Sequence, residues 1–259
     1  MPFPVASAAL VAFGLKFSAG GAHISRTMML AELDALLDGV PVGSDVGSYC
    51  AAVLTENVLN KTTASTRDKS LRHLRELYAI DEALPIFGAL RTLTRMDTQS
   101  LPLLAIQVAW ARDPLLRVTT TPVLSASDGD RVETRSLSHA LHEGFGEQYS
   151  AQNRDKIARN AASSWTQSGH LLGRTKKIRR RVQPRAGAVA MALFLGDVAG
   201  FHGAAAFTNP WCRLLDLDAD RARSLGFEAH RAGMLNLRAV GDVIEISFPL
   251  FAAFQPEPA

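Results

Sequence analysis

The chain has few cysteines, and this limits the ways in which it can be stabilised. Only two of its 259 residues are cysteines, Cys50 and Cys212, and they stand far apart among apolar neighbours. Neither a disulfide framework nor a zinc site is implied, because their spacing fits no known ligand pattern. Two buried free thiols in a reducing cytoplasm are the expected state.

A membrane span is not expected either. The apolar start of the chain, residues 1–17, is shorter than the roughly 20 apolar residues that cross a bilayer. It also lacks a positively charged segment before the apolar run, which a signal peptide would carry. We therefore expect a buried segment of a cytoplasmic protein, with a signal peptide as the alternative.

Recognisable catalytic motifs are also missing. "SAGGAH" (18–23) has glycines but neither the lysine nor the spacing of a phosphate-binding loop, and no nucleophile elbow occurs. His139, His142 and Glu143 fall within one predicted helical turn, but a third metal ligand at a recognisable spacing is lacking. Exposed or capping histidines are the favoured interpretation there. We expect no enzymatic activity, no cofactor and no metal.

Acidic residues are almost absent from one segment. Residues 151–185 hold ten lysines and arginines but a single acid, Asp155, although the whole chain has a net charge of only +3. Such a localised positive field attracts polyanions, so contact with nucleic-acid phosphates is the favoured interpretation. A solvated edge strand and a nuclear localisation signal are the alternatives. The basic residues of "GRTKKIRRRVQPR" (173–185) are Arg174, Lys176, Lys177, Arg179, Arg180, Arg181 and Arg185.

The first 150 residues predict a succession of short amphipathic helices. Ser25 is a candidate N-cap, Ser65 and Asp68 resemble a capping box, and Pro85 and Pro102 suit first helical turns. Apolar residues recur at helical spacing between these signals, and the loops are short. This pattern predicts a compact helical bundle.

After residue 150 the pattern changes. A helix over 150–169 precedes the basic segment, which Gly173 and Pro184 delimit as a strand. A helix, a short helix and another helix then lead to an alternating hairpin at 234–248. This order predicts a winged helix-turn-helix in which the basic strand pairs with the C-terminal hairpin. The predicted fold is mainly α, with a helical bundle over 1–149 and a winged-helix-like domain with a small β-sheet over 150–259.

Two further helices carry candidate nucleic-acid contacts. The 218–232 helix is the candidate groove reader, because arginine is the commonest side chain that reads guanine, although its acids would repel phosphates. The basic face of the 63–78 helix either contacts DNA or is solvated. The candidates are Arg221, Arg223 and Arg231 in the first helix, and Arg67, Lys69 and Arg72 in the second.

Four stretches are similar to a known family when they are taken together. They are "KFSAGGAHISRTMMLAEL" (16–33), "TENVLNKTTASTRDKSLRHLREL" (55–77), "LAIQVAWARDPLLR" (104–117) and "AGMLNLRAVGDVIEISF" (232–248). They resemble the BrxA family, the accessory proteins of BREX bacteriophage-exclusion systems. The resemblance implies an N-terminal bundle similar to the antitermination factor NusB, a C-terminal winged-helix-like domain, and DNA binding without catalysis.

The expected function is therefore that of a non-enzymatic component of BREX-type antiviral defence that binds double-stranded DNA, mainly through the phosphate backbone. Two alternatives stay open: a scaffold that docks other BREX subunits, and a transcription regulator of the same locus. The NusB-like resemblance also leaves RNA open as a ligand.

Overall fold

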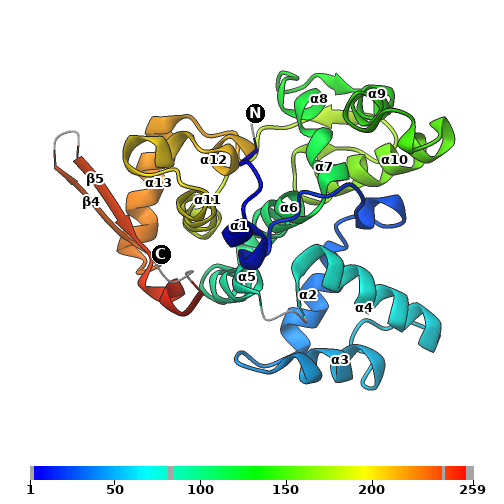
Figure 1. The fold of residues 1–259 in the computed structure, drawn as a ribbon, viewed down its shortest axis with the longest axis horizontal. Coiled ribbons are helices and arrows are strands. Elements are labelled where there is room, and N and C mark those ends of the chain that lie inside the picture. The colour runs from blue at the N-terminus through cyan, green and yellow to red at the C-terminus, as the bar shows by residue number, and fades with distance from the viewer. Residues whose placement is uncertain (1–2, 81–83, 241–242, 255–259) are drawn as a thin grey trace.

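The computed structural model describes residues 3–80, 84–240 and 243–254, and this part of the chain is mainly helical (Figure 1). The helices of the first half are α1 (Ala8–Phe13), α2 (Leu30–Gly39), α3 (Val46–Leu54), α4 (Ala64–Tyr78), α5 (Pro85–Met96), α6 (Leu101–Arg112), α7 (Pro114–Val118), α8 (Thr120–Leu124) and α9 (Thr134–Phe145). Those of the second half are α10 (Ala151–Gln167), α11 (Ala186–Val198), α12 (Pro210–Leu214) and α13 (Ala219–Arg231).

Five short strands and five 3-10 turns complete the described structure. The strands are β1 (Arg131–Val132), β2 (Leu171–Leu172), β3 (Lys177–Arg179), β4 (Asn236–Val240) and β5 (Val243–Ser247). The 3-10 turns are η1 (Ala22–Ile24), η2 (Thr98–Ser100), η3 (Gly146–Gln148), η4 (Gly203–Thr208) and η5 (Pro249–Phe254). None of the described helices has the length and apolar character needed to cross a bilayer.

Side-chain caps begin both of the long helices of the second half that carry polar first turns. Ser150 caps α10, as the sequence predicts, and accepts a hydrogen bond from Asn153 N, whereas Asp218, which the sequence places inside the first turn, is itself the cap of α13 and accepts one from Arg221 N. Each cap satisfies a backbone N–H that has no partner inside the helix. Both predicted proline positions, in the first turns of α5 and α6, are confirmed.

Two predicted caps are wrong. The cap of α4 is Thr63, whose hydroxyl accepts from Thr66 N, and not the pair further along the chain. The helix predicted to begin at Ser25 begins only at Leu30, since the preceding segment is held outside the helix. There, Met28 N donates to Ser164 Oγ, so a tertiary contact replaces the local helical bond.

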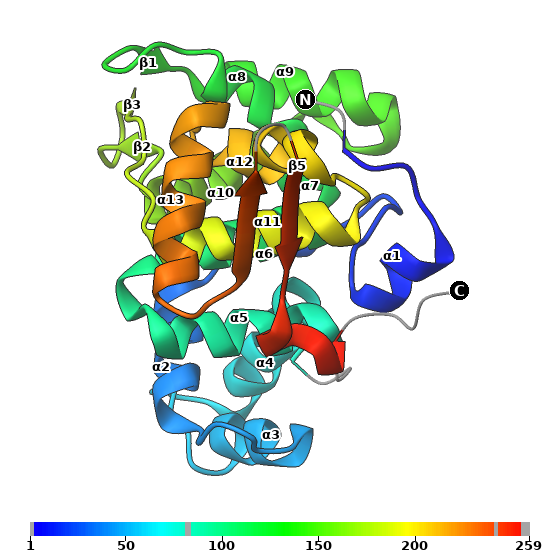
Figure 2. The same cartoon turned by 90° about the vertical axis from the view of Figure 1, so that its left-hand side faces the viewer.

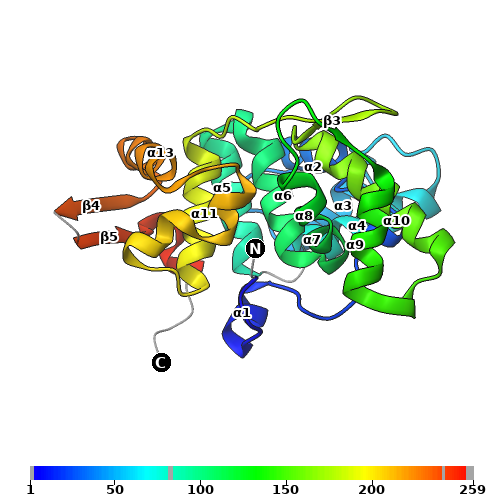
Figure 3. The ribbon, with the colours of Figure 1, turned by 90° about the horizontal axis from the view of Figure 1, so that it is seen from above.

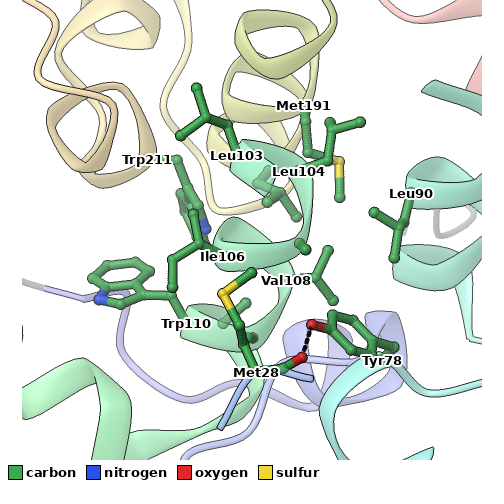
Figure 4. Packing of buried hydrophobic residues seen from close by; sticks show 14 of the residues in the cluster. Met28, Tyr78, Leu90, Leu103, Leu104, Ile106, Val108, Trp110, Met191 and Trp211 are labelled. Carbon is green, nitrogen blue, oxygen red and sulfur yellow. Dashed lines mark hydrogen bonds between the residues drawn. The ribbon is translucent and has the colours of Figure 1, made fainter. Parts of the chain in front are cut away.

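The helix α6 lies at the centre of the hydrophobic core. All of its residues from Leu103 to Arg112 are buried, with α4 and α5 on one side and α11 on another. Figure 4 shows Leu104 beside Met191 of α11, and Ile106 and Trp110 on the side of Trp211 of α12. Helices from both sides of the predicted boundary at residues 149 and 150 contribute to this core, and the boundary itself stays a prediction.

The strands form two separate sheets. In the first, β3 lies between β1 and β2, with Ile178 opposite both Arg131 and Leu172. In the second, β4 pairs only with β5, in the register Asn236↔Ser247 to Val240↔Val243. The alternating hairpin at 234–248 is confirmed, although residues 241–242 of its predicted turn lie outside the described residues.

The predicted pairing of the basic strand with the C-terminal hairpin is wrong. Both edges of β3 are already occupied by β1 and β2, so no edge remains for the hairpin. β1 lies in a stretch that the sequence predicts to be a loop, and two-residue strands are too short to show a period of two. Gly173, at a φ of 97°, makes the turn between β2 and β3, where a Cβ would stand 2.3 Å from Lys176 O.

One order of elements occurs twice in the chain. Two helices followed by a hairpin form α9–α10–β2–β3 and again α12–α13–β4–β5. Gly169, at a φ of 87°, follows the second helix in the first case, and Gly233, at a φ of 71°, does so in the other. β1 lies beside β3, and the 3-10 turn η4 lies beside β5. Figures 1 and 3 place the two units at opposite ends of the molecule.

His170 joins the two halves of this arrangement. It follows α10, is fully buried, and its Nε2 lies 2.8 Å from the carbonyl oxygen of Leu214 in α12. On the other side of the ring, Nδ1 lies 2.8 Å from Ser168 Oγ. Burial lowers the pKa of His170 to about 4, so the ring is neutral in the folded protein at neutral pH.

We expect this histidine to make the fold sensitive to mild acid. Its pKa is 6.5 when exposed and about 4 when folded, so between these values the unfolded chain binds more protons. Its contribution to stability is complete above pH 6.5 and falls by about 3 kcal/mol as the pH drops to 4. Urea unfolding at several pH values measures this slope.

The matched variants are His170→Gln and His139→Gln, because His139 is exposed. The first should lose most of the dependence of the unfolding free energy on pH between 6.5 and 4, and the second should keep it. An unchanged slope in His170→Gln would contradict the role assigned to this side chain.

Candidate nucleic-acid interface

The basic segment predicted to contact DNA forms the turn and the second strand of the β2–β3 hairpin and the irregular segment that leads from it to α11. Arg174 and Lys176 lie in its turn, where both side chains are exposed. Neither makes an ion pair with any residue in the described part of the chain. These two cations are therefore available to an anionic ligand.

Arg179 is a correction to the predicted set of contacts. Its side chain is buried at 1% exposure and forms an ion pair with Asp216, whose other carboxylate oxygen accepts from Val182 N at 3.0 Å. The guanidinium also donates to the carbonyl oxygen of Arg180. An arginine held in this way joins the strand to the segment before α13 and cannot reach a phosphate.

Two other cations of the segment have partners but stay at the surface. Arg180 lies 3.4 Å from Asp128, and both side chains are about half exposed. Arg185 directly precedes α11 and lies 3.1 Å from Asp97, which is itself 9% exposed. Asp128 and Asp97 are far from these arginines in the sequence but beside them in the fold. They therefore make the positive field of the segment weaker than the sequence suggests.

Lys177 and Arg181 complete the segment. The Lys177 ammonium donates to Thr166 Oγ1 at 2.8 Å and to the Gly173 carbonyl oxygen at 2.9 Å, and partial burial lowers its pKa. Its contact with Thr166 fixes the hairpin beside the end of α10. The side chain of Arg181 is exposed and forms no ion pair within the described residues.

The outer face of α10 carries basic residues that the sequence analysis did not single out. Gln152, Lys156, Arg159 and Ser163 are spaced by four, three and four residues, so they lie on one stripe of the helix. The first three are exposed and the fourth is half-buried. The inner face was predicted correctly, since Ile157, Ala161, Ser164, Trp165 and Ser168 are all buried. The same spacing, continued around the helix, would have identified the outer stripe.

The predicted reader helix lies elsewhere. α13 packs on α11, at the end of the molecule away from α9 and α10 (Figures 1 and 3). Arg221 and Arg231 are exposed and Arg223 is half-buried, so the predicted arginines lie on the solvent-facing side of α13. They share the surface of this helix with Asp220 and Glu228, so the face has no strong charge of one sign.

The basic face of α4 lies nearer to α10 than its place in the sequence suggests. Lys69 and Arg72 are exposed and Arg67 is half-buried. The turn η1 contacts both α4 and α10. Next to this turn is Arg26, which sequence analysis missed. Burial lowers the pKa of His73, and the charges of Arg72 and Arg26 lower it further, so both guanidinium groups lie near this ring.

A buried polar network links the N-terminal segment to α10. His23 Nδ1 lies 2.6 Å from Asp113 Oδ2, and His23 Nε2 lies 2.8 Å from Ser164 Oγ. Burial raises the pKa of Asp113, but the charge of His23 and the hydrogen bonds from His23 and Leu116 outweigh it, so the pKa is below its usual value. The three residues come from η1, the start of α7 and the middle of α10.

This serine, histidine and aspartate have the contacts of a hydrolytic triad but not its accessibility. Each of the three is at most 1% exposed. Ser164 Oγ already accepts from Met28 N at 2.8 Å and lies 3.0 Å from Asn160 O. No position next to the hydroxyl is left for a substrate carbonyl, so the network is structural.

The histidines considered as metal ligands lie on the surface of α9. His139 Nδ1 lies 3.5 Å from Glu143, and both side chains are more than 60% exposed. Among the described residues, no group of three or more His, Cys, Asp and Glu side chains could hold a metal ion. Cys212 is buried, as predicted, whereas Cys50 is half-buried, and both thiols are free.

Comparison with known proteins adds no family to this geometry: no protein-family model matches the chain, and no curated protein matches it in sequence.

We expect Arg179→Ala to destabilise the fold by about 3–5 kcal/mol, because it leaves Asp216 without its buried partner. Arg174→Ala should change the unfolding free energy by less than about 0.5 kcal/mol, since that side chain is exposed. Urea unfolding of both variants at neutral pH measures the difference. Equal stabilities would show that the two arginines do not differ in structural role.

Proposed function

We propose that the protein binds double-stranded DNA without catalysing a reaction on it, with α10 in the major groove and the β2–β3 hairpin on the phosphates. The observation that carries the proposal is the joining, in one unit, of two sets of cations that form no ion pair with any of the residues that the structure describes. Lys156 and Arg159 lie on the outer stripe of α10, and Arg174 and Lys176 lie in the hairpin that Lys177 fixes to the same helix.

The order of elements supports a winged helix-turn-helix. In that motif, one strand between the first two helices pairs with the hairpin that follows the third. Here β1 lies between α8 and α9 in the chain, and it pairs with β3 of the hairpin that follows α10. The proposed unit therefore covers residues 120–182, with α10 as the reading helix and β2–β3 as the wing. It lies earlier in the chain than the domain predicted from the sequence.

The side chains on α10 suit the edges of base pairs. Arginine and lysine donate to guanine O6 and N7, and glutamine and asparagine form paired hydrogen bonds with adenine. Lys156 and Arg159 are of the first kind, and Gln152 and Asn153, which are exposed in the first turn, are of the second. Arg174 and Lys176 would supply contacts to phosphates, which give affinity and dependence on salt but little sequence information.

The same geometry favours duplex DNA over the other candidate ligands. An A-form RNA duplex has a deep, narrow major groove that side chains cannot read, so a helix such as α10 has no counterpart there. A protein scaffold would not require such a concentration of cations, and the sequence has no acid between Lys156 and Arg181. A transcription regulator would use the same contacts with stronger base selection.

The resemblance to the BrxA family suggests the biological system in which this activity would be used. On that basis we place the protein in a BREX-type antiphage system, where other defence subunits are candidate partners. The NusB-like character of the N-terminal helices belongs to the same proposal. Arg26 and the basic face of α4 would then extend the DNA track beyond the winged unit, since α4 lies below α10 in Figure 1 and the turn η1, which precedes Arg26, contacts both helices.

We expect the double variants Lys156→Ala/Arg159→Ala and Arg174→Ala/Lys176→Ala each to weaken binding to duplex DNA. Each lost phosphate contact should reduce the slope of log affinity against log salt by about 1. Fluorescence anisotropy titrations at several salt concentrations measure both quantities. Loss of base contacts on α10 should also reduce discrimination among sequences, by about 1–3 kcal/mol per contact.

The control is Arg223→Ala/Arg231→Ala on α13, which removes the same charge from the other end of the molecule. It should leave affinity and salt slope nearly unchanged if α10 is the reader. Equal losses in all three double variants would mean that binding depends on net charge alone. A loss confined to the α13 variant would restore the reader helix predicted from the sequence.

A further inference from the structure

The outer face of the β4–β5 hairpin has no partner in the described structure. Leu237 on the inner face is 3% exposed, and Ile244 and Ile246 pack against the hydrophobic core. All six residues that point the other way are exposed: Asn236, Arg238, Val240, Val243, Glu245 and Ser247. Figure 2 shows this hairpin lying in front of α11, with its face toward the viewer.

This hairpin corresponds in chain order to the basic β2–β3 hairpin, but its chemistry differs. Its outer face carries one cation, Arg238, and one anion, Glu245. Val240 and Val243 are 80% and 72% exposed at the end of the strands. A neutral surface with an apolar end does not suit a phosphate backbone. It suits a protein surface that offers an opposite charge and an apolar contact at matching positions.

The register of the hairpin determines what that matching surface is. Asn236 lies opposite Ser247, Arg238 opposite Glu245, and Val240 opposite Val243. Along the hairpin, each outward pair therefore joins two residues of complementary type: polar with polar, cation with anion, and apolar with apolar.

A second copy of the same hairpin reproduces this complementarity. If two outer faces meet about a two-fold axis parallel to the strands, β4 of one copy lies over β5 of the other. Arg238 of each copy then faces Glu245 of the other, and Val240 of each faces Val243 of the other. Such an interface uses the same patch on both subunits, which is the commonest arrangement in protein dimers.

We propose that the outer face of β4–β5 is a docking surface for a second copy of this chain. The proposal is independent of DNA binding, because it uses none of the residues of the winged unit. Packing of the faces would cover the two exposed valines and support a two-stranded sheet, which is only marginally stable alone. Six side chains per copy are far fewer than in an interface of standard size, so the dimer should be weak and in the micromolar range.

The experiment is sedimentation velocity on the full chain without DNA, over protein concentrations up to several hundred micromolar. The wild type should show reversible monomer–dimer exchange. Arg238→Glu and Glu245→Arg should each weaken self-association by at least about tenfold, because each places like charges opposite one another across the two-fold axis. Both side chains are exposed, so neither variant should lose its fold.

An equimolar mixture of the two variants is the decisive sample. In the mixture, both acids of one chain face both arginines of the other, so the heterodimer should form although neither variant associates alone. Within each variant hairpin, residues 238 and 245 still carry like charges in this mixture. A recovery of self-association can therefore come only from contacts between the two chains. Asp220→Arg and Arg231→Glu on α13 carry the same charge changes and should associate like the wild type.

A wild type that stays monomeric at the highest concentration would overturn the proposal. So would variants that associate as strongly as the wild type, or a mixture that stays monomeric. Equal weakening by the α13 control variants would also overturn it, because self-association would then follow net charge and not this face.

Discussion

The position of α10 depends on one buried hydrogen-bond network. His23 lies between Asp113 and Ser164, and the same serine accepts the backbone N–H of Met28. A buried polar group is costly unless it is paired, so these contacts permit only one rotation of α10 about its axis. The rotation that satisfies them turns Trp165 inward and Lys156 and Arg159 outward. The surface that we propose as a DNA reader is therefore set by contacts on the opposite side of the helix.

Tertiary contacts divide the dense run of basic residues into groups with different roles. Arg179 is buried against Asp216, and Arg180 and Arg185 face acids from distant loops. The cations in the hairpin turn, Lys177 and Arg181 are left without an ion pair among the described residues, and Lys177 is held by hydrogen bonds. In the folded chain, one arginine of this run is therefore buried in an ion pair, two form ion pairs at the surface, and the remaining cations form a smaller exposed patch. The exposed patch gains in importance because it lies beside α10.

The repeated order of helices and hairpin shows how one arrangement carries two surfaces. In the first unit the hairpin is basic and β1 covers its edge, whereas in the second it is neutral and η4 lies beside β5. The order of elements and a glycine of positive φ after the second helix are shared. The surface side chains are not, because exposed positions are free of packing constraints. We propose a polyanion as the ligand of the first unit and a second copy of the chain as the partner of the other.

The sequence by itself determined most of the local structure. Nearest-neighbour rules predict the Ser150 cap, the prolines of α5 and α6, the inner face of α10 and the β4–β5 hairpin, and the structure confirms them. Only the tertiary structure decided which strand pairs with the basic segment, which arginine is buried and which basic helix stands beside the hairpin. These outcomes depend on contacts between residues 37 to 141 positions apart, such as Arg179 with Asp216 and His23 with Ser164. A local pattern of charge or hydrophobicity carries no information about such partners, because burial is a property of the whole folded chain.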